Sequence, residues 1–468
     1  MNNIWHYWLF FACTILYMYA GQLYAQPQQP PIYNNSADTT AVAIDYYQPQ
    51  TLRYENAVYR ESIGSVIFRV KGLELSDPFL QLPPKRTIAP PPAVLELTFD
   101  EFGNTANYYS YKIVHCSADW QPSRLDPFDY IDGFLRDDIV NYAYSFNSVQ
   151  PYVNYRLEIP NNNMRPTVSG NYLLKVYAND NEEDLVLTRR FVIYENMLRV
   201  EIKALPTSIS AYFETHQRLE FEVAYSQQDF SVGNPLLDFY TTVLQNGRWD
   251  NALQDIKPTF LHNDAMIFSS MDQTLFAGGN EFRFFDTRCL QTKCSNVLRI
   301  ERDKKNTADP NYHVWLYPDK MADRHRRYRL GGYDLNGKFY IGIDSRFNFN
   351  LLDADYVYTH FALSLDKPIG DEGNIYIFGA LSDWQTKPEF MMHYNPKTQN
   401  YEGTVFLKQG LYDYQYVWQK DGKALPDASK LEGSYAAAEN TYTVIVYQHL
   451  PNKRYDRVVG FLTIQVNR

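Results

Sequence analysis

Apolar and polar residues alternate with a period of two in several short segments of the chain. In residues 94–99 the apolar side chains Leu95, Leu97 and Phe99 are separated by polar ones, and residues 219–225 repeat the pattern as Leu-Glu-Phe-Glu-Val-Ala-Tyr. Successive residues of a β-strand point to opposite faces, so this alternation predicts strands with one buried face. The period of about 3.6 residues that marks an amphipathic helix is absent from residues 52–194.

Residues that favour turns separate the predicted strands. Asn336-Gly337 precedes the apolar residues 339–341, and Asp421-Gly422 follows the strand-like residues 412–418. These dipeptides favour a type I′ hairpin turn because both central positions need a positive φ. Short strands joined by turns at this spacing are typical of antiparallel sandwiches. The expected fold class is all-β, with tandem immunoglobulin-like or early-set antiparallel β-sandwich domains.

The chain has 468 residues, too many for one hydrophobic core. A prior of about 100 to 200 residues per domain predicts roughly three domains. We place β-sandwiches at residues 52–195 and 196–350, and an early-set-like β domain at residues 351–468. Residues 26–51 are rich in Gln, Pro, Asn and Thr and have no apolar period, which predicts a flexible leader.

The first 25 residues have the pattern of an export signal. An apolar run at residues 8–20 is followed by Leu-Tyr-Ala, which ends at Ala25 immediately before Gln26. A small residue at that point suits cleavage by signal peptidase, so we expect a cleaved signal peptide and an exported, mostly periplasmic protein. An uncleaved membrane anchor is the alternative, although the run is shorter than the roughly 20 residues that span a bilayer.

Composition narrows the possible partners. The formal net charge is -10, which argues against a nucleic-acid-binding protein because such proteins carry a basic surface. The 40 Tyr and 28 Phe residues favour strands. One dense basic cluster contains Arg324, Arg326, Arg327 and Arg329. It is either a solvated loop or a contact for an acidic partner or a lipid head group.

The positions of the cysteines predict structural roles for them, as a disulfide or as a buried apolar group. Cys289 and Cys294 are close enough in sequence to bridge a loop in an oxidising compartment, and the sequence leaves open whether they do. Cys116 follows a strand-like segment, where a buried thiol usually acts as a small apolar group. No further ligands stand near these cysteines at the spacing of a zinc site, so we expect no metal.

Catalytic motifs are missing from the sequence. It contains neither G-x-S-x-G nor H-E-x-x-H. His115 and Cys116 are neighbours and could form a nucleophilic pair, but adjacent strand residues point to opposite faces. The acidic residues 180–184 could bind calcium or form an exposed hairpin tip, and the tip is favoured. We therefore expect a protein that is not an enzyme and has no cofactor; a hydrolase with a site between domains is an alternative.

Two segments near the C-terminus resemble the early-set immunoglobulin-like domains attached to starch and glycogen enzymes. Residues 375–384 read Ile-Tyr-Ile-Phe-Gly-Ala-Leu-Ser-Asp-Trp, and residues 410–414 read Gly-Leu-Tyr-Asp-Tyr. The resemblance gives an alternative function, a periplasmic carbohydrate-binding protein. Trp384 and Trp418 would then be either glycan platforms or, as the favoured interpretation, core residues.

A longer series of motifs runs from about residue 52 to the C-terminus. It includes His-Cys-Ser-Ala-Asp-Trp at 115–120 and Tyr-Ile-Asp-Gly-Phe at 130–134. The other members lie at residues 53–56, 145–147, 169–176, 189–191, 354–357, 408–410, 432–434, 439–442 and 454–457. In this order the motifs resemble the plug proteins of the type 9 secretion system, although Cys289 and Cys294 depart from the family pattern.

The resemblance to this family implies a function and a partner. It implies a periplasmic plug that binds the large outer-membrane β-barrel translocon and occludes its periplasmic opening. It also implies that the plug acts by protein–protein interaction without catalysis, and that it takes no small-molecule substrate. The Tyr and Arg content agrees with this, because both residue types are enriched in the cores of protein interfaces.

Overall fold

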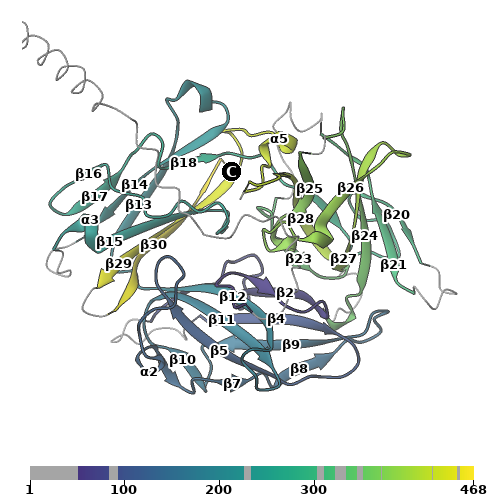
Figure 1. The fold of residues 1–468 in the computed structure, drawn as a ribbon, viewed down its shortest axis with the longest axis horizontal. Coiled ribbons are helices and arrows are strands. Elements are labelled where there is room, and N and C mark those ends of the chain that lie inside the picture. The colour runs from purple at the N-terminus through teal and green to yellow at the C-terminus, as the bar shows by residue number, and fades with distance from the viewer. Residues whose placement is uncertain are drawn as a thin grey trace, which may run out of the picture. The chain divides into compact units, whose positions relative to one another are not determined.

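Antiparallel β-sheets make up almost all of the regular structure in the computed structural model of the protein (Figure 1). The structure describes residues 51–83, 93–225, 233–302, 310–321, 334–344, 351–369, 372–423, 425–450 and 454–467. These residues belong to one structural unit that begins at Ile44. The predicted all-β fold class is confirmed. The predicted export signal at residues 1–25 and the leader up to residue 50 lie outside the described residues.

The first sandwich consists of two sheets and a small two-stranded pair. The first sheet has the order β1 (Ala57–Val58), β12 (Leu185–Tyr194), β11 (Gly170–Ala178), β5 (Tyr109–Cys116) and β7 (Asp137–Asp138), with β3 (Phe79–Gln81) parallel to β12. The second has the order β2 (Ile63–Val70), β4 (Leu95–Phe102), β9 (Tyr152–Ile159) and β8 (Asn141–Tyr144). A short helix, α2 (Pro127–Tyr130), precedes the pair formed by β6 (Ile131–Gly133) and β10 (Met164–Pro166).

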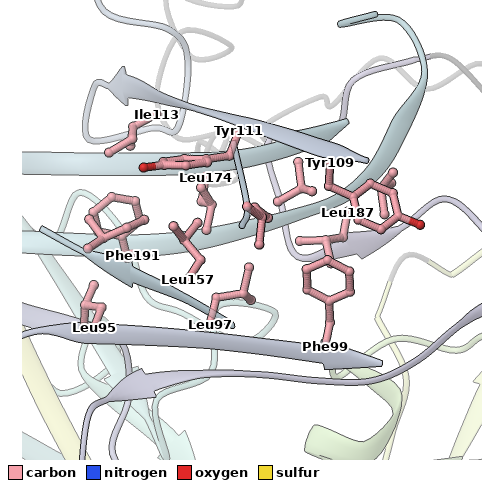
Figure 2. Close-up of a cluster of buried hydrophobic side chains, with 14 of the residues drawn as sticks. Leu95, Leu97, Phe99, Tyr109, Tyr111, Ile113, Leu157, Leu174, Leu187 and Phe191 are labelled. Atoms are coloured by element: carbon pink, nitrogen blue, oxygen red, sulfur yellow. The ribbon is translucent and has the colours of Figure 1, made fainter. Parts of the chain in front are cut away.

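The core of the first sandwich lies between its two sheets. Leu95, Leu97 and Phe99 are fully buried on β4, as their alternation with polar residues predicts. Figure 2 shows these side chains pointing toward residues of the facing sheet that include Leu174 and Phe191. Burying a large apolar side chain contributes about 1.5–3 kcal/mol, so this layer is a main source of the domain's stability.

The second sandwich combines strands from the middle and the end of the chain. One sheet has the order β13 (Arg199–Pro206), β14 (His216–Ala224), β17 (Ala265–Phe268) and β16 (Phe260–Leu261), with β18 (Leu275–Ala277) on β14. The other contains β15 (Phe239–Gln245), β29 (Asn440–Leu450) and β30 (Tyr455–Val466). The short helices η1 (Ser210–Tyr212) and α3 (Pro235–Asp238) lie between strands. Phe221 and Val223 share its core with Val243 and Val444.

The third part is a ten-stranded sheet. Its main order is β19 (Arg283–Asp286), β28 (Gly410–Lys420), β25 (Gly373–Phe378), β26 (Met391–Asn395), β27 (Asn400–Lys408), β24 (Tyr356–Ser364), β21 (Tyr312–Leu316) and β20 (Val297–Glu301). Strands β22 (Asp319–Lys320) and β23 (Phe339–Ile341) pair with β24 and β28. The short helices are η2 (Leu351–Asp353), η3 (Ala380–Ser382), η4 (Pro388–Phe390) and α5 (Ser429–Glu432). The Asp286 N–H donates to the Ser295 carbonyl at 3.1 Å, which brings β19 back toward the start of β20.

The strand pairing crosses the domain boundary that the sequence suggests between residues 350 and 351. Strand β15 pairs with β29, and β19 pairs with β28, so each sheet contains strands from both sides of that boundary. Local alternation identifies a strand but carries no information about a partner that lies far away in the sequence. The chain therefore leaves the second sandwich, forms the ten-stranded sheet and returns.

Buried contacts join the first sandwich to the second. Leu173 and Val192, on the outer face of its first sheet, pack against Ile445 and Val458. The Tyr447 hydroxyl donates to Asn171 Oδ1 at 2.9 Å. Because apolar side chains and a buried hydrogen bond both contribute, this contact is a fixed part of the fold. No helix within the described ranges is long and apolar enough to cross a membrane.

Candidate protein-interaction surface

The first sandwich exposes a group of large apolar side chains in one segment of sequence. The group consists of Phe128, Phe134, Val140, Tyr142, Tyr144 and Phe146, each between 47% and 80% exposed. We call these six residues the apolar edge. They follow the chain from α2 through β7 to β8, three elements that Figure 1 shows along the same margin of the sandwich. Single exposed apolar residues are common, but a concentration of them is typical of an interaction surface.

Helix α2 holds Phe128 outward. Asp126 caps the helix by accepting a hydrogen bond from the Phe128 N–H at 3.1 Å, and Asp129 accepts one from the Asp126 N–H at 3.3 Å. This reciprocal arrangement satisfies two N–H groups that a helix start leaves unpaired. At the other end of α2 the buried Tyr130 donates to the Ile113 carbonyl at 3.3 Å. The exposed ring of Phe128 therefore stands on a helix that is anchored at both ends.

The antiparallel pair of β6 and β10 fixes Phe134. The Phe134 N–H donates to the Asn163 carbonyl at 2.7 Å. The preceding residue, Gly133, has a φ of +109°, and a Cβ atom there would lie 2.1 Å from the same carbonyl oxygen. Only glycine fits this combination of conformation and close approach.

Strand β8 is the last strand of its sheet, and its core-facing side lies beyond the part that the facing sheet covers. Tyr142 lies opposite Tyr155, and Tyr144 lies opposite Val153. Tyr155 and Val153 are buried in the sandwich core, so the two exposed tyrosines are on the core-facing side of the sheet. The facing sheet ends at the two-residue strand β7. The rings of Tyr142 and Tyr155 have centroids 5.8 Å apart, which makes the exposed rings a continuation of the core.

The margin beside the apolar edge is acidic. Residues 126–138 contain five aspartates and one arginine, Arg136, which forms an ion pair with Asp138 at 3.5 Å. Tyr111 donates to Asp137 Oδ2 at 3.1 Å. Burial raises the pKa of the Tyr111 hydroxyl well above its usual range, so the hydroxyl keeps the proton that it donates. The negative charge is thus held in place on β7.

His115 and Cys116 are both buried and neutral. The His115 Nε2 atom lies 3.3 Å from the Ser169 carbonyl oxygen, and burial lowers the pKa of the ring to about 4. Burial raises the pKa of the Cys116 thiol to about 12. A nucleophilic cysteine needs a low pKa and access to solvent, and this thiol has neither.

The cysteines and arginines singled out in the sequence lie elsewhere. Cys289 and Cys294 form a disulfide in the connection between β19 and β20, with their Cα atoms 5.7 Å apart. The basic residues Arg324, Arg326, Arg327 and Arg329 lie outside the described residues.

Other protein groups contact the rings of the two tryptophans. The Trp384 ring has Phe378 and Phe282 at centroid distances of 5.6 and 5.9 Å, and the Arg248 guanidinium lies 4.4 Å from its centroid. The Lys430 Nζ atom lies 3.2 Å from the centroid of the Trp418 ring. These contacts agree with the favoured core role of both rings, and the glycan platform stays a prediction.

The acidic residues 180–184 form the exposed turn between β11 and β12. Asp184 pairs with Arg60, and Asp180 pairs with Arg136. These carboxylates are therefore neutralised by arginines of the same domain. Among the residues that the structure describes, no group of three or more His, Cys, Asp or Glu side chains is placed to hold a metal ion.

Sequence reasoning did not identify the apolar edge as a surface. Two of the family motifs overlap it, at residues 130–134 and 145–147, but a motif does not show exposure. The available signal was the unusual mixture of Phe with Asp, Pro and Gly in residues 126–134. Turn-forming residues keep a segment at the surface, so aromatic residues among them are exposed more often than those in a strand.

Comparison with known proteins relates the first sandwich to a known domain family. Residues 63–195 match the type 9 secretion system plug protein first domain. The chain is also similar to a hypothetical protein from Parabacteroides merdae, known from a crystal structure, with 29% sequence identity and a TM-score of 0.81. That similarity covers 89% of this chain and 100% of the other. No curated protein matches the chain. The matched residues 63–195 include the whole apolar edge.

Proposed function

Because residues 63–195 form the first domain of a type 9 secretion system plug protein, we propose that the chain binds the outer-membrane translocon of this system and closes its periplasmic opening. The family that the motif series predicts is confirmed by this match. Closure of an opening requires a rigid protein with a large contact surface, and needs no reaction.

The apolar edge is the structural observation that supports this proposal most directly. It lies within the matched domain, and its Tyr142 ring extends from the core residue Tyr155 toward solvent. Contact between water and exposed aromatic side chains is unfavourable, and a partner that covers them removes this cost. The anchored helix α2 and the pairing of β6 with β10 at Gly133 keep Phe128 and Phe134 in place before binding, which lowers the entropic cost of association.

Two further observations are consistent with a non-catalytic protein that works in the periplasm. The His115 and Cys116 pair is held neutral by burial, which argues against the nucleophilic role that its sequence allows. The disulfide between Cys289 and Cys294 suits an oxidising compartment, in agreement with the predicted export signal.

Affinity capture tests the proposal. The full chain, carrying a C-terminal tag, would be produced in its own organism and captured from outer membranes solubilised in a mild detergent. The proposal predicts that a very large β-barrel protein is recovered with it, and that an unrelated exported protein with the same tag recovers none. Recovery of the chain without the barrel would contradict the proposal.

A further inference from the structure

Strand β8 is an uncharged free edge. It contains four residues, Asn-Tyr-Ala-Tyr, and within the described part of the chain it is the last strand of its sheet. An edge strand presents unpaired N–H and C=O groups to its surroundings, and proteins usually protect such edges with charges, proline or very short strands. Strand β8 has no charged residue and no proline. Just beyond it the Phe146 N–H donates to the Leu352 carbonyl at 2.9 Å, so the open part of this edge is limited to the strand itself.

The hydrogen bonds to β9 show which groups of β8 face outward. The Ser145 N–H donates to the Tyr152 carbonyl at 2.8 Å, so these two residues form a hydrogen-bonded pair. Such pairs alternate with non-bonded ones along an antiparallel ladder. Tyr142 and Tyr144 therefore occupy the non-bonded positions, and their N–H and C=O groups point away from β9.

The edge of the facing sheet is protected in the way that β8 is not. Strand β7 has only two residues, Asp137 and Asp138, and both are acidic. Ser110 donates to Asp138 at 2.9 Å, and Tyr111 donates to Asp137, so the two charges are fixed at this edge. The edge at β7 thus disfavours an added strand. The neighbouring edge at β8 can accept one.

We propose that β8 is the docking strand of the plug, and that an extended segment of the translocon pairs with it as an added edge strand. The proposal rests on the proposed function. Apolar residues at alternate positions of the segment would cover Tyr142 and Tyr144, where the core of the sandwich is open. Strand addition of this kind combines backbone hydrogen bonds with pockets for every second side chain.

The charge of the partner segment follows from the neighbouring residues. Asp137 and Asp138 precede β8 by only a few residues, so they border the end of the strand at Asn141. Asp138 already pairs with Arg136 at 3.5 Å. Asp137, in contrast, accepts hydrogen bonds from the uncharged Tyr111 and Asn163 side chains. A segment with a basic residue at that end would therefore be complementary to Asp137. A second copy of this chain is less suitable, because it would bring the same aspartates to the contact.

Substitutions at Tyr144 separate the contribution of the backbone from that of the ring. Tyr144→Pro removes the outward N–H but leaves the hydrogen bonds of β8 to β9 in place, and proline is tolerated on edge strands. Tyr144→Thr keeps the N–H and removes the ring. Tyr317→Thr is the matched control, because Tyr317 is 54% exposed and Tyr144 is 51% exposed, and Tyr317 lies outside the first sandwich.

The test is the affinity of each full-length variant for the purified translocon barrel. We expect Tyr144→Pro to raise Kd at least about tenfold, Tyr144→Thr to raise it less, and Tyr317→Thr to leave it unchanged. In the wild-type complex, hydrogen exchange should show new protection of the Tyr142 and Tyr144 amides, a measurement that does not depend on any variant folding.

The outcomes distinguish this inference from the proposed function. If the wild-type chain does not bind the barrel, the proposed function fails. If the wild-type chain binds and the Tyr142 and Tyr144 amides gain no protection, or Tyr144→Pro binds equally well, only the docking strand is wrong. A stable dimer of the free chain that Tyr144→Pro abolishes would also overturn the inference, since it would assign β8 to self-association.

Discussion

The Lys408 amine lies 2.6 Å from Asp100 Oδ2, and the two residues are only 5% and 1% exposed. Asp100 belongs to the first sandwich and Lys408 to the ten-stranded sheet. Tyr356 donates to the same carboxylate oxygen at 2.7 Å, and Asn154 donates to the other at 2.8 Å. Each buried charge needs its partner, so this cluster fixes the two sheets to each other.

Replacement of Lys408 by Met should destabilise the protein strongly. It leaves the Asp100 carboxylate buried without a counter-charge, which typically costs about 3–5 kcal/mol. The midpoint of urea unfolding should therefore fall. The double variant with Asp100→Asn and Lys408→Met should recover part of the loss, because it buries no charge. If the single and the double variant unfold at the same urea concentration, the pair is not coupled in this way.

Stability should fall as the pH decreases from about 6.5 to 4, because of His115. Its folded-state pKa is about 4, below the 6.5 of an unfolded chain, so the unfolded state binds more protons over this range. This one ring accounts for about 3 kcal/mol between the two limits. The measurement is the free energy of unfolding at pH 7 and at pH 4.5.

The matched variants for that measurement are His115→Gln and His393→Gln. The first should reduce the difference between the two pH values, and the second, at an exposed position, should leave it as in the wild type. Burial also lowers the pKa of His360 to about 4, so part of the pH dependence should persist in the first variant. An unchanged pH dependence in His115→Gln would show that this ring is not protected from protonation.

No thiol should react in the native protein when it is produced from residue 26 onward, without the predicted export signal and its Cys13. Cys116 is fully buried and its pKa is raised to about 12, so a disulfide reagent that detects thiolates should not react with it. After unfolding in denaturant without reductant, one thiol per chain should react, because Cys289 and Cys294 are bridged. Cys116→Ala should then show none. Rapid reaction of the native protein, or three thiols after unfolding, would contradict the assignment.

Gly133→Ala should disrupt the pairing of β6 with β10, which positions Phe134. The new Cβ would meet the Asn163 carbonyl oxygen at 2.1 Å in a backbone conformation that alanine rarely adopts, and we expect a loss of at least about 2 kcal/mol. Gly72→Ala is the control, because Gly72 also has a positive φ but nothing lies within 4 Å of its Cβ position. Equal losses in the two variants would show that the close approach contributes nothing.

Sequence patterns predicted the strands better than their partners. The alternation in residues 94–99 identifies the buried face of β4 because the period of two is a local property. The pairing of Val243 with Val444 is not local, and no pattern in either strand specifies it. For this reason the second sandwich could not be recognised as a combination of two distant segments.

The exposure of the candidate surface also could not be predicted from local sequence patterns. The residues Tyr142 and Tyr144 have the spacing of an inward-facing strand, and they do point to the core side of their sheet. Their exposure comes from the facing sheet, which stops at β7, and that is a property of two sheets together. The bridge between Cys289 and Cys294 was left open by the sequence for a related reason, since spacing permits a disulfide but does not require it.

The most direct test of the central claim is the ion conductance of the purified translocon barrel in a planar bilayer. Addition of the full chain to the periplasmic side should abolish the conductance, and Tyr144→Pro at the same concentration should block it much less. Tyr317→Thr should block it as the wild type does. A conductance that the wild-type chain leaves unchanged at saturating concentration would contradict the claim that this protein closes the opening.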